Sequence, residues 1–531
     1  MSLTKVSYSM ILGAPINVLD FGAVGDGVTN DTAAFQAALD YIGSAGGGEL
    51  YIPSNTYMIA ADTFPGGGDD YGLIVSNNTT INMTDGTILK VITTANDNYR
   101  IFSVVNKSNI TINGGVLYGD LETHTTSTEH GYGIAILGSS DVYINSVITK
   151  QFKGDGIYVG YSTSIPFSQR IHIRNCIIHT NYRNGIAFTG CADSSISGCS
   201  VYNHLTYSGV GIDLEPDATR IVQNINVTNC NLSDNIVGIG IQRTAGNGAT
   251  LEKLNITSNT IREVTSGVTI VNANSVNVVG NQITNSTVFG VYVLHSSYIN
   301  IASNFSKSNT TNGFVYLANT SGVTEFISVT GNILRSDYSI VNLVGSSGFT
   351  VNNVLIADNN ANGCVDAILI AYSKNVSVVS NLIEGSSNRG IFFSSNNTFG
   401  AIKSNFINLC AGIGIQVATN DTSIETNTVN NCGKEGISVT GTGCILNGNR
   451  TSSNGTLTNA TYSNILINAD RNHIVANQIR RGSNANLPQY GIYIQTGTSN
   501  NVASNDMFQG GTTGAFLDSG TSTTTSNNII V

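Results

Sequence analysis

The sequence contains no tryptophan, and only 11% of its 531 residues are charged. It also lacks any run of about eighteen apolar residues, so we expect no segment to span a membrane. The 33 acidic residues outnumber the 23 lysines and arginines, giving a net charge of -10. A nucleic-acid partner is therefore not expected, because binding phosphate requires a basic face. No Cys-x-x-Cys pair occurs among the eight cysteines, which predicts small buried side chains rather than a metal site or a disulfide framework.

Glycine is abundant instead, with 58 residues, and Asn, Ser and Thr are also frequent. This composition is not typical of a helical protein, and it suits many short β-strands joined by tight turns. The stretch from Met1 to Val18 has a single lysine and no long apolar run, so it does not read as a secretory signal.

A repeat runs through most of the chain. Glycine followed by alternating apolar residues recurs at Gly133, Gly156, Gly185, Gly211, Gly238, Gly267, Gly290, Gly313, Gly390, Gly412, Gly436, Gly491 and Gly514. The first steps are 23, 29, 26, 27, 29, 23 and 23 residues long. An asparagine marks the end of another strand in many of these repeats: Asn175, Asn229, Asn259, Asn281, Asn304, Asn332, Asn359, Asn381, Asn405, Asn427, Asn449, Asn477 and Asn505.

A period of this length with β alternation predicts a solenoid, in which stacked turns share one apolar core. From residue 70 onward the chain is long enough for about 18 turns. The asparagines would stack as a ladder of amides, at positions where Gly and Asn accept left-handed backbone. A β-propeller or a sandwich is the alternative, but a propeller needs ~40–45 residues per blade and no such period is visible.

An amphipathic helix is predicted ahead of the repeats. Asn30 or Asp31 can cap it, and its apolar positions fall on one face at helical spacing: Phe35, Ala38, Leu39 and Ile42. The glycines at 46–48 end it, and the next strand covers 49–53. Such a helix can lie across the open end of a β stack and shield its core and its unpaired backbone edge.

The segment from Asn17 to Tyr57 resembles the N-terminal signature of the pectate-lyase-like family of right-handed parallel β-helices, and in particular bacteriophage tailspike depolymerases. The resemblance implies an all-β, single-stranded right-handed parallel β-helix with an N-terminal capping α-helix. The expected parts are an arm at 1–16, a capping segment at 17–69 and the β-helix at 70–531. It also implies that Asp26 and Asp31 are structural. The implied partner is a bacterial surface polysaccharide, and the implied setting is a homotrimer in a virion tail or outside the cell.

The candidate catalytic residues lie in the stretch from Gly211 to Pro216, which reads as a short strand. If Ile212 and Leu214 point into the core, Asp213 and Glu215 point outward together, roughly 6–7 Å apart. Paired carboxylates are what acid–base cleavage of a sugar bond requires. Small residues flank the pair in the neighbouring repeats. Asp155, between two glycines, is the first substitute for either carboxylate.

Other candidates surround this pair. The predicted substrate-binding residues are Tyr158, Arg183, Arg243, Asp120, Glu129 and His130. Tyr158 offers a ring face for a sugar, and the loop that carries Asp120, Glu129 and His130 can fold over the floor of the next turns. A metal site at His124, Glu129 and His130 is a weaker alternative because their spacing is not that of a ligand set, so we expect no metal and no cofactor.

The expected activity is endo-hydrolysis of a polysaccharide. The Asn-Thr-Asp, Gly-His-Gly and Arg-Ile-Lys motifs of polygalacturonases are absent, and residues 157–159 are not the Asp-Pro-His of alginate epimerases, so pectin or alginate chemistry is not expected. The estimated separation of the pair favours inversion over retention. A polysaccharide lyase on the same fold, or a non-catalytic carbohydrate-binding or structural spike, remains the alternative.

Overall fold

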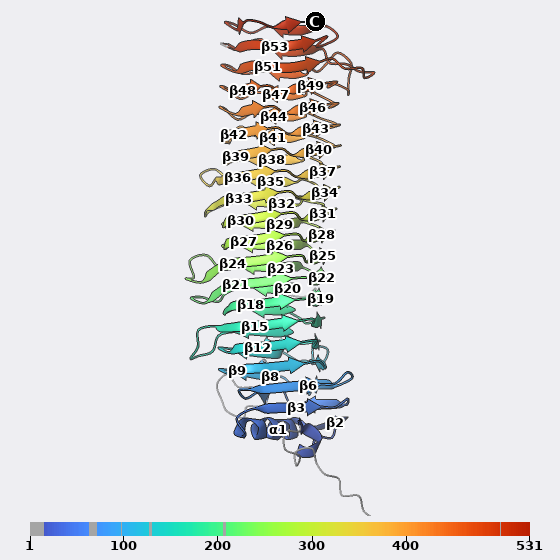
Figure 1. The fold of residues 1–531 in the computed structure, drawn as a ribbon, viewed down its shortest axis with the longest axis vertical. Helices are drawn as coiled ribbons and strands as arrows, with labels where there is room; N and C mark the ends of the chain where they lie inside the picture. Colours follow the sequence, from blue (N-terminus) through green and yellow to red (C-terminus); the bar gives the residue numbers. More distant parts are fainter. Residues whose placement is uncertain are drawn as a thin grey trace, which may run out of the picture. The chain divides into compact units, whose positions relative to one another are not determined.

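The computed structural model describes residues 15–62, 72–96, 98–126, 130–204, 209–499 and 501–530. Within these ranges the chain forms β-strands, one short 3-10 helix (Val18–Phe21) and one α-helix, α1 (Thr32–Ser44) (Figure 1). The predicted all-β fold, a right-handed parallel β-helix, is confirmed. The chain divides into two compact units, residues 1–276 and 277–531, and strand β27 (Asn274–Val279) contains the boundary. In the described residues no helix is both long enough and apolar enough to cross a membrane.

In the first unit each turn contributes a strand to three parallel ladders. The first ladder comprises β1 (Ile16–Asn17), β3 (Gly48–Ile52), β6 (Thr79–Met83), β9 (Ser108–Asn113), β12 (Ser140–Asn145), β15 (Ser168–Arg174), β18 (Cys191–Ser197), β21 (Ile221–Thr228) and β24 (Thr250–Thr257). The second comprises β2 (Asp26–Asn30), β4 (Thr56–Ile59), β7 (Ile88–Val91), β10 (Val116–Tyr118), β13 (Ile148–Lys150), β16 (Ile177–His179), β19 (Ser200–His204), β22 (Asn231–Asn235) and β25 (Thr260–Arg262). The third comprises β5 (Leu73–Ile74), β8 (Asn98–Val105), β11 (His130–Leu137), β14 (Ile157–Gly160), β17 (Ile186–Phe188), β20 (Val210–Leu214), β23 (Val237–Gln242) and β26 (Ser266–Val271).

The second unit repeats the three ladders. The first holds β30 (Ser297–Ala302), β33 (Thr324–Thr330), β36 (Val351–Ala357), β39 (Ser373–Val379), β42 (Thr398–Lys403), β45 (Ser423–Glu425), β48 (Ile445–Asn447), β51 (His473–Arg480), β53 (Val502–Phe508) and β55 (Thr524–Thr525). The second holds β28 (Gln282–Thr284), β31 (Phe305–Lys307), β34 (Ile333–Arg335), β37 (Asn360–Asn362), β40 (Leu382–Glu384), β43 (Phe406–Asn408), β46 (Thr428–Asn430), β49 (Arg450–Ser452) and β56 (Ile529–Ile530), with β51 and β53 continuing into it. The third holds β29 (Phe289–Leu294), β32 (Val315–Ala318), β35 (Val341–Val344), β38 (Ile368–Ala371), β41 (Ile391–Phe393), β44 (Ile415–Val417), β47 (Ile437–Val439), β50 (Ile465–Ile467), β52 (Tyr490–Ile494) and β54 (Gly514–Asp518).

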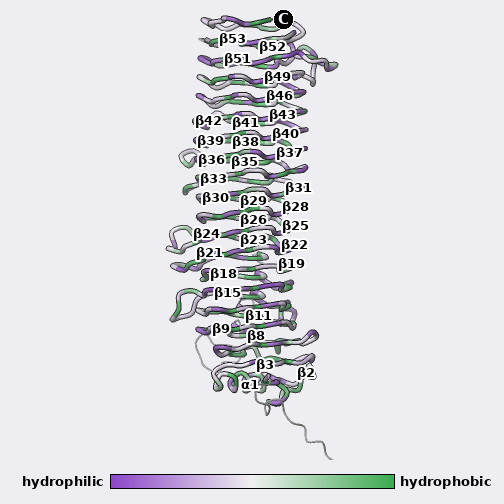
Figure 2. The backbone as a smooth tube through the Cα atoms, in the orientation of Figure 1, coloured by the Kyte–Doolittle hydropathy of each residue, from purple (hydrophilic) through white to green (hydrophobic). Residues whose placement is uncertain are grey.

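Alternation along each strand builds the core. In Figure 2, hydrophobic and hydrophilic residues interchange within single turns. The inward positions are aliphatic and fully buried, as Ile157, Ile186, Ile212 and Ile239 show on four successive turns. Because the side-chain period of a strand is two, the residues that alternate with these inward residues along each strand face outward and can take part in binding or catalysis.

Helix α1 closes the first turn as predicted and packs beside β3. Its apolar face, which includes Phe35 and Leu39, is buried. Asp31 occupies the N-cap position without a side-chain capping bond, and Asn30 Oδ1 accepts the backbone N–H of Thr32, the first helical residue, at 3.1 Å. Asp31 instead accepts the N–H of Val24 at 2.6 Å, which ties down the preceding loop. A structural role for Asp31 follows directly from this contact.

The amide ladder is confirmed in the second unit. Each ladder asparagine donates its side-chain N–H to the Oδ1 of the next one, from Asn281 to Asn304 (3.0 Å) and onward to Asn505. The expected left-handed backbone, however, falls one residue earlier, as at Ser404 (φ 56°) before Asn405. The ladder side chain is buried, and the residue before it has the left-handed backbone of the turn.

Two turns of the first unit have cysteine at the ladder position, which corrects two assignments. Asn175 and Asn229 are the left-handed residues of their turns, with φ of 53° and 55°. The ladder positions after them are Cys176 and Cys230, and the N–H of Cys230 donates to Asn259 Oδ1 at 2.9 Å. All eight cysteines are buried and unbridged, as expected from their spacing.

Candidate active site

The third ladder of the first unit places Asp213 on its outer face. Asp213 of β20 pairs in register with Ala187 of β17 and Gly240 of β23, and Tyr158 of β14 pairs with Ala187. Asp213 alternates with the buried Ile212 and therefore points away from the core. Its neighbours along the column are small, as predicted. A methyl group at Gly240 would lie 3.0 Å from Asp213 Oδ1, so the glycine keeps the space beside this carboxyl open.

Asn184 connects the turns around Asp213. It is fully buried, its Nδ2 donates to Asp213 Oδ2 at 3.2 Å, and its Oδ1 accepts the N–H of Val210 at 3.2 Å. Its own backbone N–H donates to Asp155 Oδ1 at 2.9 Å. Our sequence reasoning missed this residue. The available signal was that Asn184 precedes Gly185 in the same way that Asp155 precedes Gly156 one turn earlier.

Arg183 joins the remaining carboxylates. Its Nη1 lies 3.5 Å from Asp155 Oδ2 and its Nη2 lies 3.8 Å from Glu215 Oε2. The Asp155 side chain is fully buried, whereas that of Glu215 is 38% exposed. We call Asp155, Arg183, Asn184, Asp213 and Glu215 the acidic cluster. The structure therefore brings together all three predicted catalytic residues and one predicted substrate-binding residue.

Asp213 is the carboxyl whose surroundings favour its protonated form. Burial raises the pKa of Asp213 well above its usual value, and the charge of Glu215 and a hydrogen bond with Glu215 raise it further. The guanidinium of Arg183 acts in the opposite direction but does not cancel the increase. Asp213 is only 2% exposed, so water does little to stabilise its ionised form. The site thus combines a buried carboxyl whose pKa is raised with a second carboxyl that is partly exposed.

The separation of roughly 6–7 Å between the carboxyls of Asp213 and Glu215 stays a prediction. It assumes that both residues belong to one strand, but β20 ends at Leu214, so strand alternation fixes the direction of Asp213 and not that of Glu215.

Tyr158 lies beside the acidic cluster with one ring face covered. Its ring stacks on that of Tyr132 at 4.7 Å and 12°, and its hydroxyl shares a hydrogen bond with Thr189 Oγ1 at 2.7 Å. At most one ring face is therefore available to a sugar. His130 is exposed and its Nδ1 lies 3.0 Å from the hydroxyl of Tyr132, so it reaches the rim of the site through Tyr132.

Asp217 was also missed. It is half-buried two residues beyond Glu215. Burial raises the pKa of Asp217 above its usual value, although a hydrogen bond from Tyr161 and the charges of Arg183 and Arg220 act in the opposite direction. Its position in the chain, directly after the predicted pair, was the available signal. It adds a further carboxylate that shares Arg183 with the acidic cluster.

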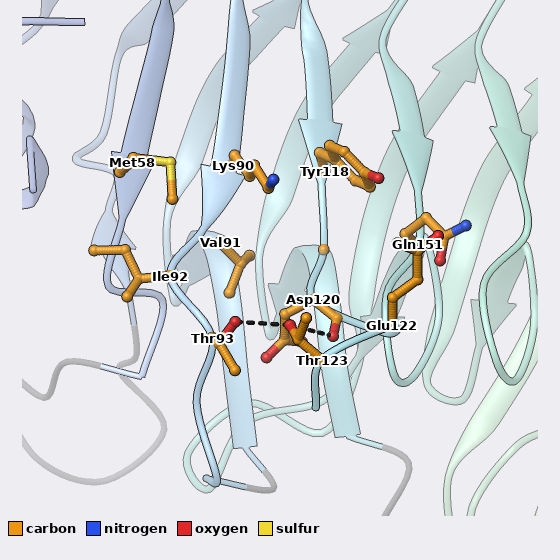
Figure 3. Close-up of a pocket in the computed structure, with 11 residues that line it drawn as sticks. Met58, Lys90, Val91, Ile92, Thr93, Tyr118, Asp120, Glu122, Thr123 and Gln151 are labelled. Atoms are coloured by element: carbon orange, nitrogen blue, oxygen red, sulfur yellow. Dashed lines mark hydrogen bonds between the residues drawn. The ribbon is translucent and has the colours of Figure 1, made fainter. Parts of the chain in front are cut away.

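Asp120 lies elsewhere, in a separate pocket of about 330 Å³ (Figure 3). Its Oδ2 accepts the N–H of Thr94 at 3.1 Å and contacts Nδ1 of His124 at 3.1 Å. Lys90, Tyr118 and Gln151 line the same pocket. The loop after β10 folds back against this corner, and loop geometry of that kind is not encoded in the repeat period.

The remaining predictions have different outcomes. The Nε of Arg243 donates to the backbone oxygen of Asn272 at 2.6 Å, so this side chain turns toward the next turn of the helix. Glu129 lies outside the described residues. Of the alternative metal ligands, His124 contacts Asp120 and Thr126 whereas His130 contacts Tyr132, so the two imidazoles serve different networks.

Comparison with known proteins identifies the family. The model of the right handed beta helix region matches residues 100–262 and 324–451, more than half of the chain. The chain belongs to this family. Among curated β-helix relatives, the uncharacterized protein YclG of Bacillus subtilis is 35% identical over 222 residues, which cover 38% of each chain. Mannuronan C5-epimerase AlgE1 of Azotobacter vinelandii is 30% identical over 206 residues, covering 36% of this β-helix chain and 14% of AlgE1.

A solved structure extends the likeness in fold. The tailspike protein of E. coli bacteriophage HK620, determined in complex with a pentasaccharide, superposes with a TM-score of 0.59. The alignment covers 86% of this β-helix chain and 81% of the tailspike at 13% sequence identity. The chain spans well under half the length of the curated relatives it matches, and the tailspike likeness concerns the fold alone.

Proposed function

We propose that this β-helix protein is a depolymerase that hydrolyses a bacterial surface polysaccharide at the acidic cluster. The observation that carries the proposal is the pairing of a buried Asp213, whose pKa is raised, with a partly exposed Glu215. Glycoside hydrolysis requires one carboxylic acid to protonate the leaving oxygen and one carboxylate to act on the other side of the bond. Likeness in fold to a tailspike that binds a pentasaccharide supports a glycan substrate and a virion-tail or extracellular setting.

The roles follow from the electrostatics. Asp213 donates its proton to the glycosidic oxygen, and Glu215 takes a proton from the attacking water. The Arg183 guanidinium, 3.8 Å from Glu215, favours negative charge on that carboxylate. Asn184 orients Asp213 through its 3.2 Å hydrogen bond and acts as a positioning residue. For the reaction, Glu215 must separate from Asp213 to admit water and sugar, and its exposed position allows that movement.

Uronate chemistry is the second candidate, and it is supported by the 30% identity to mannuronan C5-epimerase AlgE1. An epimerase or a lyase must remove a proton from C5 of an acidic sugar. The acidic cluster holds three carboxyls against one arginine, and this balance disfavours an anionic sugar. A non-catalytic carbohydrate-binding or structural spike is the third candidate.

Turnover against a panel of capsular and lipopolysaccharide glycans, with products analysed by mass spectrometry, separates these candidates. The proposal predicts saturated oligosaccharides from the wild type and none from Asp213→Asn. Unsaturated products would indicate a lyase, and binding without cleavage of any glycan would indicate a spike. Homotrimer formation stays a prediction from the tailspike resemblance, and analytical ultracentrifugation tests it.

A further inference from the structure

A second polar pocket lies in the second unit, on the outer face of three neighbouring strands. It has a volume of about 360 Å³ and is lined from β46, β49 and β51. Two outward positions on each strand form its floor, and the inward residues between them, such as Val429 and Ile479, are fully buried. The floor positions are Thr428, Asn430, Arg450, Ser452, Gln478 and Arg480. We call this site the arginine pocket.

Its lining is basic in a chain whose net charge is -10. Arg450 and Arg480 are the charged lining residues, and none of the described residues that line the pocket carries a carboxylate. Arg450 pairs with Gln478 and Ser452 pairs with Arg480, so the two arginines stand diagonally, one strand and two residues apart. Their Cα atoms are then about 8 Å apart and their side chains share one face, so both guanidiniums can reach the same anion.

The other lining groups are hydroxyls and amides. Thr428, Ser452 and Gln478 present donors and acceptors of the kind that bind sugar hydroxyls. The loop after β51 supports one wall, because Nδ2 of Asn484 donates to Asn431 Oδ1 at 3.0 Å and to the backbone oxygen of Ser453 at 3.2 Å. The pocket is therefore held in shape by the chain around it.

We propose that the arginine pocket binds an acidic sugar, with its oxyanion held between Arg450 and Arg480 and its hydroxyls held by the polar floor. The planar guanidinium matches carboxylate, sulfate and phosphate oxygens, which is the chemistry these anions share. The site is separate from the acidic cluster and requires no cleavage, so the inference goes beyond the proposed hydrolysis.

Ligand-observed saturation-transfer NMR at low salt tests the pocket on the full chain. The probes are D-glucuronate and a glucose monosulfate, with D-glucose as the uncharged counterpart. Inorganic sulfate has no hydrogen to observe, so its binding is measured from its displacement of D-glucuronate. Saturable binding of both acidic sugars is expected, with D-glucose and inorganic sulfate each at least about tenfold weaker. Equal binding of D-glucose would overturn the role of the arginines, and equal binding of inorganic sulfate would overturn the role of the sugar. If neither acidic sugar shows saturable binding, the whole proposal is overturned.

Variants localise the binding. Arg450→Met and Arg480→Met should each weaken acidic-sugar binding about tenfold or more, while leaving the thermal midpoint unchanged because both side chains are exposed. Arg450→Lys should restore only part of the affinity, since lysine lacks the planar fork. The matched control is Arg262→Met, which changes an exposed arginine on β25 of the first unit. It should leave the binding of the acidic sugars unchanged. Undiminished binding in both pocket variants would place the ligand elsewhere.

Discussion

Replacing Asp213 with asparagine should increase the stability of the protein relative to the wild type, and the difference should grow as the pH rises. Because the pKa of Asp213 is raised in the fold, the folded chain keeps a proton that the unfolded chain releases above about pH 4. The unfolded state then binds fewer protons, so the stability that protonated Asp213 contributes is fully present below its unfolded pKa and is lost as pH rises toward its folded pKa. The loss amounts to ~1.4 kcal/mol per pH unit.

The Asp213→Asn variant has no proton to lose at this position. Its stability relative to the wild type should therefore increase by ~1.4 kcal/mol per pH unit from about pH 4 until the folded pKa is reached. For a cooperative unit of about 250 residues this corresponds to roughly 2–4 °C in thermal midpoint per pH unit. Scanning calorimetry at one fixed scan rate is the suitable assay, because long chains often unfold irreversibly.

A matched control separates this effect from the general consequences of removing a carboxyl group. Asp234 is exposed on β22 and has a left-handed φ of 54°, which asparagine accepts. The Asp234→Asn variant should show no such dependence on pH. If the Asp213→Asn variant also differs from the wild type by a constant amount between about pH 5 and about pH 8, Asp213 is ionised in the fold and the assignment of the acid is refuted.

Three further substitutions test other parts of the account. Glu215→Gln should lower turnover at least about 100-fold while glycan binding persists, measured by release of reducing ends; unchanged turnover would remove Glu215 from the reaction. Gly240→Ala places a methyl group 3.0 Å from Asp213 Oδ1 and should lower turnover about tenfold or more by displacing the carboxyl, a result that full activity would contradict. Asn405→Ala removes the hydrogen bonds that Nδ2 of Asn405 donates to the backbone oxygen of Val378 and to Oδ1 of Asn427. It should lower the stability of the second unit by ~2–4 kcal/mol, seen as a lower thermal midpoint with turnover retained. An unchanged midpoint would mean that the ladder contributes little.

Most of the fold could be predicted because its determinants repeat. The interval between glycines reports the length of one turn, and the spacing of Phe35 and Leu39 reports a single capping helix. At the ladder, the left-handed backbone was predicted one residue too late in the sequence. Asparagine is common both in left-handed turns and as an inward amide, so the sequence alone could not separate Asn175, which is left-handed, from Asn281, which is in the ladder.

The candidate site was predictable only where it follows strand register. Asp155 and Asn184 occupy equivalent places before the glycines of successive turns, which the glycine repeat reveals, and Asn184 contacts both Asp155 and Asp213. Contacts that depend on side-chain torsions or on loops could not be inferred. The direction of the Glu215 side chain depends on the chain leaving the strand at Leu214, and Asp120 lies in its own pocket because of a loop that has no period.

The central claim is that the acidic cluster adds water across a glycosidic bond. Cleavage of an active glycan in heavy-oxygen water, followed by mass spectrometry of the products, tests it most directly. The account predicts that every new reducing end made by the wild type carries one heavy oxygen, and that the Asp213→Asn and Glu215→Gln variants make no product. Unlabelled, unsaturated ends, or labelled products from both variants at the wild-type rate, would contradict it.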